Sequence, residues 1–191
     1  MKDIVLNNLC KAYGDHRVLD SFSAVIPAGR ISCITGPSGR GKTTLLRLLM
    51  GLESPDGGNI VGLSGLRLSA VFQEDRLCEN LNPMTNIRLA CPQRSRQDIL
   101  AALKAMGLAG CAAQPVCTLS GGMRRRVALL RALLADYDIL FLDEPFKGLD
   151  AGTKAVVIDE TRRRVAGKSV LLVTHDPEET AALNADYHIT L

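Results

Sequence analysis

Residues 36–43 constrain the fold most strongly, because they form a glycine-rich loop between a predicted strand and a predicted helix. The strand is the buried run Ile31–Thr35, and the helix presents an apolar face from Lys42 to Met50. The loop fits the pattern G-x-x-x-x-G-K-[ST], in which backbone N–H groups surround a polyphosphate. The order of strand, loop and helix is the context that this pattern requires. The sequence therefore predicts a nucleoside triphosphate site.

Within this loop the pattern assigns separate tasks to individual side chains. Lys42 is expected to reach the terminal phosphates, and the Thr43 hydroxyl is expected to hold Mg²⁺. The helix that begins near Lys42 points the positive end of its dipole at the phosphates. Arg40 occupies a variable place in the pattern and adds little beyond solvation. The residues predicted to bind the nucleoside triphosphate here are Gly36, Pro37, Ser38, Gly39, Arg40, Gly41, Lys42, Thr43 and Thr44.

The chain beyond the loop alternates apolar strands with helices, which predicts a parallel sheet and an α/β fold. The first thirty residues read instead as antiparallel strands, and 76–118 reads as a helical insertion. The expected strands are 68–72, 139–142, 169–174 and 187–191, the expected helices are 97–106, 122–135, one opening near Asp150 and one from Pro177, and a turn is expected at 54–58. Ser120 and Asp176 are predicted N-caps, with Glu179 at the capping-box position of the second.

Four polar or glycine positions follow directly after predicted strands. They are Gly36, Gln73, Asp143 and His175. In open parallel sheets ligands bind beyond the carboxyl ends of the strands, so these positions are expected at one edge. Asp143 and its neighbour Glu144 would both be carried to that edge with little freedom to move. The alternative for this acidic pair is a helix cap or a turn.

Composition predicts a single domain over residues 1–191, since this length is sufficient to bury a substantial core. The formal net charge of +3 is too small to favour a nucleic-acid surface, so no nucleic-acid partner is expected. The six cysteines contain no C-x-x-C pair and are interpreted as buried packing residues in a reducing compartment. No apolar run approaches the about 20 residues of a membrane-spanning helix, so work at a membrane would require a partner.

The segment Leu119-Ser120-Gly121-Gly122 stands between the phosphate loop and the acidic strand end. With this segment in place, the chain resembles the ATP-binding cassette (ABC) family over essentially its whole length, with the motifs in the expected order. The resemblance implies a P-loop NTPase fold of RecA-like type. Its parts are a parallel sheet core, an N-terminal antiparallel β subdomain and the helical insertion at 76–118.

The resemblance also implies roles around an ATP bound with Mg²⁺. Asp143 would orient the metal through water, and Glu144 would polarise the attacking water as general base. His175 matches the family's switch histidine, which contacts the γ-phosphate, and Gln73 matches a glutamine that touches both Mg²⁺ and the attacking water. Tyr13 matches an aromatic residue that stacks on adenine. Considered alone, His175 could be an ordinary core histidine, Gln73 a solvated polar residue and Tyr13 a turn residue.

In this family the terminus at Leu119, Ser120, Gly121 and Gly122 completes the ATP site of the opposite subunit. Ser120 would cap a helix while the two glycines leave its first N–H groups bare. A plain, well-capped helix is the alternative. The resemblance therefore implies a head-to-tail homodimer that holds two ATP molecules. Gly148-Leu149-Asp150 resembles the loop that crosses between the two sites.

The sequence thus predicts a Mg-dependent ATPase subunit of an ABC transporter, on the cytoplasmic side of the membrane and docked on permease subunits. Glu144-Pro145-Phe146 and the segment 71–76 resemble bacterial nitrate, sulfonate, taurine and thiamine importer ATPases. A periplasmic or surface solute-binding protein is then a further expected partner. The alternatives are an exporter or lipoprotein-release ATPase, a non-transport ABC ATPase, and a nucleotide-binding scaffold without turnover. An intact Glu144 and His175 argue against the scaffold.

Overall fold

The fold combines two β-sheets with six α-helices in the part of the chain that the computed structural model describes, residues 2–37 and 39–191. The strands are β1 (Ile4–Tyr13), β2 (His16–Ile26), β3 (Ile31–Thr35), β4 (Gly57–Val61), β5 (Leu68–Val71), β6 (Ile139–Asp143), β7 (Ser169–Val173) and β8 (Tyr187–Thr190). The helices are α1 (Lys42–Leu49), α2 (Pro83–Ala90), α3 (Arg96–Ala105), α4 (Gly121–Leu134), α5 (Ala151–Val165) and α6 (Pro177–Ala182), with short 3₁₀ turns η1 (Ala109–Cys111) and η2 (Val116–Thr118).

The first sheet is antiparallel, with strand order β2-β1-β4. Ile4 pairs with Ile26 across β1 and β2, and Val5 pairs with Val61 across β1 and β4. The predicted N-terminal antiparallel strands are confirmed. The turn expected at 54–58 is partly wrong, because β4 begins at Gly57, which pairs with Cys10 of β1.

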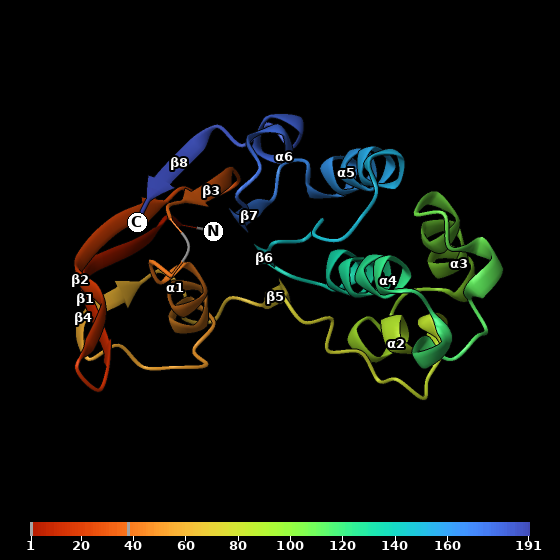
Figure 1. Cartoon of the computed structure of the whole chain (residues 1–191), viewed down its shortest axis with the longest axis horizontal. Coiled ribbons are helices and arrows are strands. Elements are labelled where there is room, and N and C mark those ends of the chain that lie inside the picture. Colours follow the sequence, from red (N-terminus) through yellow and green to blue (C-terminus); the bar gives the residue numbers. More distant parts are fainter. Residues whose placement is uncertain (1, 38) are drawn as a thin grey trace.

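The second sheet is parallel and forms the centre of the molecule, with order β5-β6-β7-β3-β8. All residues of β6 and β7 are buried, as expected for central strands that are covered on both faces. Figure 1 shows this sheet between the antiparallel sheet at one end and the helices α2 and α3 at the other. The predicted α/β fold with a parallel core is confirmed.

The two faces of the parallel sheet contribute to two separate hydrophobic clusters. Phe141 and Leu171 pack with α1 and the antiparallel sheet, whereas Leu140 and Leu172 pack with α4 and the helices around it. Successive residues of a strand point to opposite faces, so each of these short strands supplies both clusters. Burial of each such side chain contributes about 1.5–3 kcal/mol. The central strands are thereby fixed, and so are the loops that leave their carboxyl ends.

The segment between β5 and α4 is helical, with α2 and α3 packed against α4. The buried amide of Asn86 ties α2 to the incoming chain, since it accepts from Cys78 N at 2.8 Å and donates to Cys78 O at 3.0 Å. The boundaries of an inserted subdomain at 76–118 remain a prediction. None of the helices in the described residues combines the length and apolar character needed to cross a bilayer.

The two predicted helix caps are confirmed, and the predicted capping box is wrong. The side chains of Ser120 and Asp176 cap α4 and α6 as predicted. The capping box expected from Glu179 does not form: Asp176 accepts from Glu178 N at 2.9 Å, and the Glu179 carboxylate bonds elsewhere. The interpretation of all six cysteines as buried is also wrong, because Cys78 and Cys117 are exposed and Cys10 is half-buried.

Candidate active site

The phosphate loop leaves the carboxyl end of β3 and enters α1 at Gly41, whose φ of 89° and ψ of 12° are left-handed. A Cβ at this position would lie 2.5 Å from Val18 Cγ1, so a larger residue would clash with β2 as well as strain the backbone. None of the side chains that the structure describes caps α1. Its first N–H groups are therefore available to an anion, and the helix dipole favours negative charge there.

The ammonium of Lys42 is held inside the loop by backbone oxygens. Its Nζ donates to Gly36 O and to Pro37 O, each at 2.8 Å, and the residue is only 6% exposed. An ammonium has three donors, so one remains for a ligand. The contacts with the loop carbonyls place a buried positive charge beside the N-terminus of α1.

Asp143, the last residue of β6, lies beside the hydroxyl of Thr43, which donates to its Oδ2 at 3.2 Å. Its Oδ1 is buried and has no hydrogen-bond partner among the described residues. Burial raises the pKa of Asp143, and the nearby Thr43 hydroxyl and Gln73 amide only partly oppose this effect. A buried carboxylate oxygen without a partner fits a bound cation, because such groups are otherwise hydrogen-bonded.

Glu144 and His175 face each other at 3.1 Å, measured from His175 Nε2 to Glu144 Oε1. Glu144 has a φ of 48°, a left-handed backbone that is uncommon outside glycine, and its N–H donates to Val173 O at 2.9 Å. Burial raises the pKa of the Glu144 carboxyl, whereas the neighbouring His175 acts in the opposite direction. The strained backbone thus holds a carboxyl of raised pKa against the histidine.

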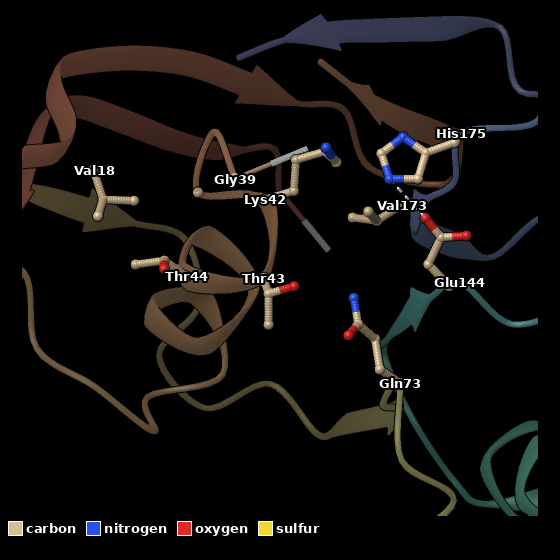
Figure 2. Close-up of a pocket in the computed structure, with 10 residues that line it drawn as sticks. Val18, Gly39, Lys42, Thr43, Thr44, Gln73, Glu144, Val173 and His175 are labelled. Atoms are coloured by element: carbon tan, nitrogen blue, oxygen red, sulfur yellow. Dashed lines mark ion pairs between the residues drawn. The ribbon is translucent and has the colours of Figure 1, made fainter. Parts of the chain in front are cut away.

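Lys42, Thr43, Glu144 and His175 line one cavity of about 210 Å³ together with Gln73 (Figure 2). Asp143 is not among the lining residues and reaches the site through its contact with Thr43. Lys42 and Thr43 lie on one side, and Gln73, Glu144 and His175 on the other. The volume is smaller than a typical drug-sized ligand pocket, and it suits a polyphosphate better than a whole nucleotide. The complete lining is Val18, Gly39, Gly41, Lys42, Thr43, Thr44, Gln73, Glu144, Val173 and His175.

Some predicted site residues lie outside this cavity. Tyr13 ends β1, is 45% exposed and donates its hydroxyl to Glu53, and the exposed Arg40 lines a different hollow beside β2. Ser38 lies outside the described residues. Val18 lines the cavity and has no signal in the sequence, because its place depends on the β1–β2 hairpin folding over the phosphate loop.

Residues Leu119 to Gly122 are also outside the cavity. Ser120 Oγ accepts from Met123 N at 3.3 Å and so caps α4. A Cβ on Gly122 would lie 3.4 Å from Leu149 Cδ2, which places this helix terminus against the loop that leads to Asp150. Asp150 itself is exposed and caps α5 by accepting from Thr153 N at 3.0 Å. Within one chain, the two candidate phosphate-binding termini therefore do not share a cavity.

Arg125 is a further site residue that the sequence did not reveal. Its guanidinium is buried and donates to Pro145 O at 3.0 Å, to Asp143 O at 2.8 Å, and to Glu144 O and Phe72 O at 2.5 Å each. It therefore ties the segment after β5 to the segment after β6. One feature of the sequence indicates this burial. Arg125 lies one helical turn before the buried Leu129, so the middle one of three consecutive arginines is on the inward face of α4.

The site combines a glycine-rich loop at a helix terminus with a buried lysine. It also places a hydroxyl beside a strand-end carboxylate, with a second carboxylate on the opposite side. This combination defines a P-loop nucleoside triphosphatase. A sequence model described as ABC transporter matches residues 19–147. The chain is 42% identical over 192 residues to the aliphatic sulfonates import ATP-binding protein SsuB 1 of Nocardia farcinica, covering 98% of this chain and 77% of that protein. It is 40% identical over 177 residues to the zinc import ATP-binding protein ZnuC of Yersinia enterocolitica, covering 91% and 70%.

A solved structure described as a bacterial Atm1-family ABC exporter with ATP bound superposes with a TM-score of 0.87 at 26% identity. The superposition covers all of this chain and 37% of that one. This chain belongs to the ABC transporter family and is an ATP-binding subunit with ATPase activity. The resemblance to importer ATPases that the sequence predicted is confirmed by the sulfonate and zinc import relatives.

Proposed function

We propose that this chain hydrolyses ATP at the cavity between the phosphate loop and the ends of β5, β6 and β7, with Glu144 as general base. The observation that carries the proposal is the Glu144–His175 pair at 3.1 Å, which faces Lys42 across that cavity. The raised pKa of Glu144 makes it a stronger base towards a water molecule than an exposed carboxylate. His175 would contact the γ-phosphate from the same wall.

Binding of ATP would use the backbone and the cationic side of the cavity. The bare N-terminus of α1 would receive the phosphates, and Lys42 would offset their charge with its remaining donor. The other loop residues from Gly36 to Thr44, apart from Pro37, which has no N–H, would supply N–H groups, and Tyr13 would stack on the adenine. The Tyr13 side chain at the end of β1 is 45% exposed, which supports such a stack, and Lys11 Nζ lies over its ring, 5.6 Å from the centroid.

The residues Thr43, Asp143 and Gln73 would hold Mg²⁺. All three donate oxygen ligands, which this ion prefers, and Oδ1 of Asp143 is buried without a partner among the described residues. When bound, Mg²⁺ neutralises charge that develops on the phosphate oxygens. Asp143 is held rigidly at the end of a fully buried strand, so it can orient the ligand shell with little loss of entropy.

We also propose a head-to-tail homodimer in which Leu119 to Gly122 complete the ATP site of the second chain. The position of this terminus outside the cavity of its own chain supports a role in trans. The contact of Gly122 with the loop at 148–149 supports a role for Asp150 in linking the two sites.

The transport role follows from the relatives. They are named as sulfonate and zinc import proteins, which favours import of a small solute through membrane permease subunits at the cytoplasmic face. A periplasmic or surface solute-binding protein would deliver that solute. The solved exporter has a similar fold, but it is only 26% identical to this chain. It therefore supports a role in export less strongly than the relatives support a role in import.

The Mg²⁺ assignment is tested by Asp143→Asn. The matched control is Asp138→Asn, because Asp138 directly precedes the first residue of β6, whereas Asp143 is its last residue. We expect Asp143→Asn to need about tenfold more Mg²⁺ for half-maximal ATPase rate, since it weakens a ligand-orienting carboxylate. Asp138 bonds Arg67 far from the cavity, so its variant should titrate as the native chain does. Equal Mg²⁺ requirements in all three proteins would remove Asp143 from the metal site.

The shared-site dimer is tested by mixing Lys42→Ala chains with Ser120→Arg chains. Each variant alone should be nearly inactive, because both of its composite sites carry a lesion. A heterodimer has one doubly damaged site and one intact site, so the mixture should recover part of the ATPase activity. A mixture that forms heterodimers and stays as inactive as its parents would contradict independent shared sites.

A further inference from the structure

The ammonium of Lys154 on α5 joins two carboxylates that follow His175 in the chain, Asp176 and Glu179. Its Nζ lies 2.5 Å from Asp176 Oδ2 and 2.5 Å from Glu179 Oε1. Glu179 is almost fully buried, with a relative exposure of 4%, and the Lys154 side chain is 25% exposed. A buried carboxylate needs such a partner, because leaving its charge unpaired is strongly unfavourable.

Both neighbours of His175 belong to this network. Thr174 donates its hydroxyl to Glu179 Oε2 at 2.5 Å, and Asp176 N–H donates to Thr174 Oγ1 at 3.1 Å. The residue before the histidine and the residue after it are therefore both fixed, directly or through Glu179, to one ammonium. The histidine side chain itself remains half exposed and reaches Glu144.

The backbone of Lys154 extends the network towards the loop at 148–150. Lys154 N–H donates to Asp150 O at 2.8 Å, in the first turn of the helix that Asp150 caps. A displacement of Asp150 would therefore move Lys154 and, through its ion pairs, the two residues that flank His175. A single residue therefore connects the two loops, through its backbone N–H on one side and its ammonium on the other.

The charges of the network support each other. Partial burial disfavours the charged form of Lys154, but hydrogen bonds to Asp176 and Glu179 outweigh it and hold the pKa of Lys154 above its usual value. The hydrogen bond from Lys154 in turn keeps the pKa of Asp176 low. Lys154 and Asp176 are thus both ionised near neutral pH.

We propose that Lys154 is a positioning residue for His175, which it holds against Glu144 by clasping Asp176 and Glu179, and that it couples this loop to Asp150. The proposal rests on the role proposed above for His175 at the γ-phosphate. Lys154 acts through the histidine and its flanking residues. Its loss is therefore expected to affect turnover rather than ATP binding.

The test compares Lys154→Met, Lys154→Arg and a control on the same helix, Arg162→Met, in the full chain with ATP and Mg²⁺. Arg162 pairs with Asp159 at 2.5 Å, and both side chains are about half exposed. We expect Lys154→Met to lower kcat by about tenfold or more, because a misplaced catalytic group costs that order of rate, and to leave ATP affinity unchanged. Lys154→Arg should restore most of kcat, and Arg162→Met should keep it.

A second variant guards against simple unfolding. Lys154→Met/Glu179→Gln removes both charges, so no unpaired carboxylate remains buried, and its Tm should lie nearer to the native value than that of Lys154→Met. Its kcat should still be low, because the clasp is absent. A native kcat in this folded double variant would overturn the proposal, as would a loss of kcat in Arg162→Met equal to that in Lys154→Met.

His175→Ala separates the two proposals in single-turnover measurements. If His175→Ala retains native kcat, the proposed role of the histidine is wrong. If His175→Ala is slow and Lys154→Met is not, the histidine role stands and the positioning role fails. If both are slow, adding Lys154→Met to His175→Ala should cost no further rate; an additional loss as large as in the native background would show that Lys154 does not act through His175.

Discussion

The two sides of the candidate active site are built in different ways. The phosphate loop is local: its glycines, Lys42 and Thr43 lie within a few residues, and the Lys42 ammonium bonds to oxygens five and six positions away. The facing side is assembled from loops after β5, β6 and β7, which are held by side chains of α4 and α5, notably Arg125 and Lys154. One side is encoded by a short motif, and the other by packing between distant segments.

This difference separates binding from turnover. The local side presents positive charge and the N–H groups of a helix terminus, which suit phosphate. The facing side carries the base and the histidine, whose positions depend on long-range contacts. Lesions on the first side should therefore act mainly on affinity, and lesions on the second mainly on kcat.

The largest expected effect is that of Glu144→Gln on the facing side. The amide cannot accept a proton from water, so kcat should fall by about 10² to 10⁴ while ATP binding is kept. Rapid-quench hydrolysis and nucleotide titration measure the two quantities separately. Normal turnover in this variant would assign the base to another group and would remove the chemical distinction between the two sides.

Lys42→Ala on the local side should instead weaken ATP binding by about 10- to 100-fold, since a hydrogen bond to a charged group contributes about 1.5–3 kcal/mol. Arg40→Ala is the matched control, because Arg40 lies in the same loop, is exposed and does not line the cavity. Its affinity should be native. Equal losses in the two variants would indicate general loop damage instead of a specific contact.

Arg125→Lys tests whether long-range packing holds the facing side. An ammonium cannot reproduce the planar fork that spans Phe72 and Glu144, so we expect kcat to fall about tenfold with little change in ATP affinity. Arg67→Lys is the control: Arg67 joins the starts of the same two strands through Asp138, at the edge away from the cavity. A native kcat in Arg125→Lys would show that this side is stable without its guanidinium.

The sequence predicted the local side well and only part of the facing side, for the same physical reason. The phosphate motif specifies its own backbone, and apolar strands predict which residues emerge at the sheet edge, so Asp143 and His175 were found. Val18, Arg125 and Lys154 contribute through contacts across 18 or more residues, which no local pattern encodes. Glu179 was assigned to a capping box because its spacing fits one, but Lys154 and Thr174 compete successfully for its carboxylate.

The smallest expected effect is a shift of the pH profile of kcat when Lys147 is replaced. Lys147 is an exposed residue beside the facing side. Burial raises the pKa of Glu144, and the neighbouring His175 and Lys147 lower it. Lys147→Met removes the positive charge of Lys147, so the pKa of Glu144 should rise. Since the ionised carboxylate is the active base, the acid limb of the kcat profile should move to higher pH.

Lys147→Arg keeps the charge and should keep the native profile. The Lys147→Met shift should shrink as salt is added, because the interaction of an exposed charge is screened with a Debye length of about 8 Å at physiological ionic strength. A shift that persists at high salt would indicate a structural change rather than a change in field. If there is no shift even at low salt, the kcat profile does not report Glu144, and its acid limb belongs to another group on the facing side.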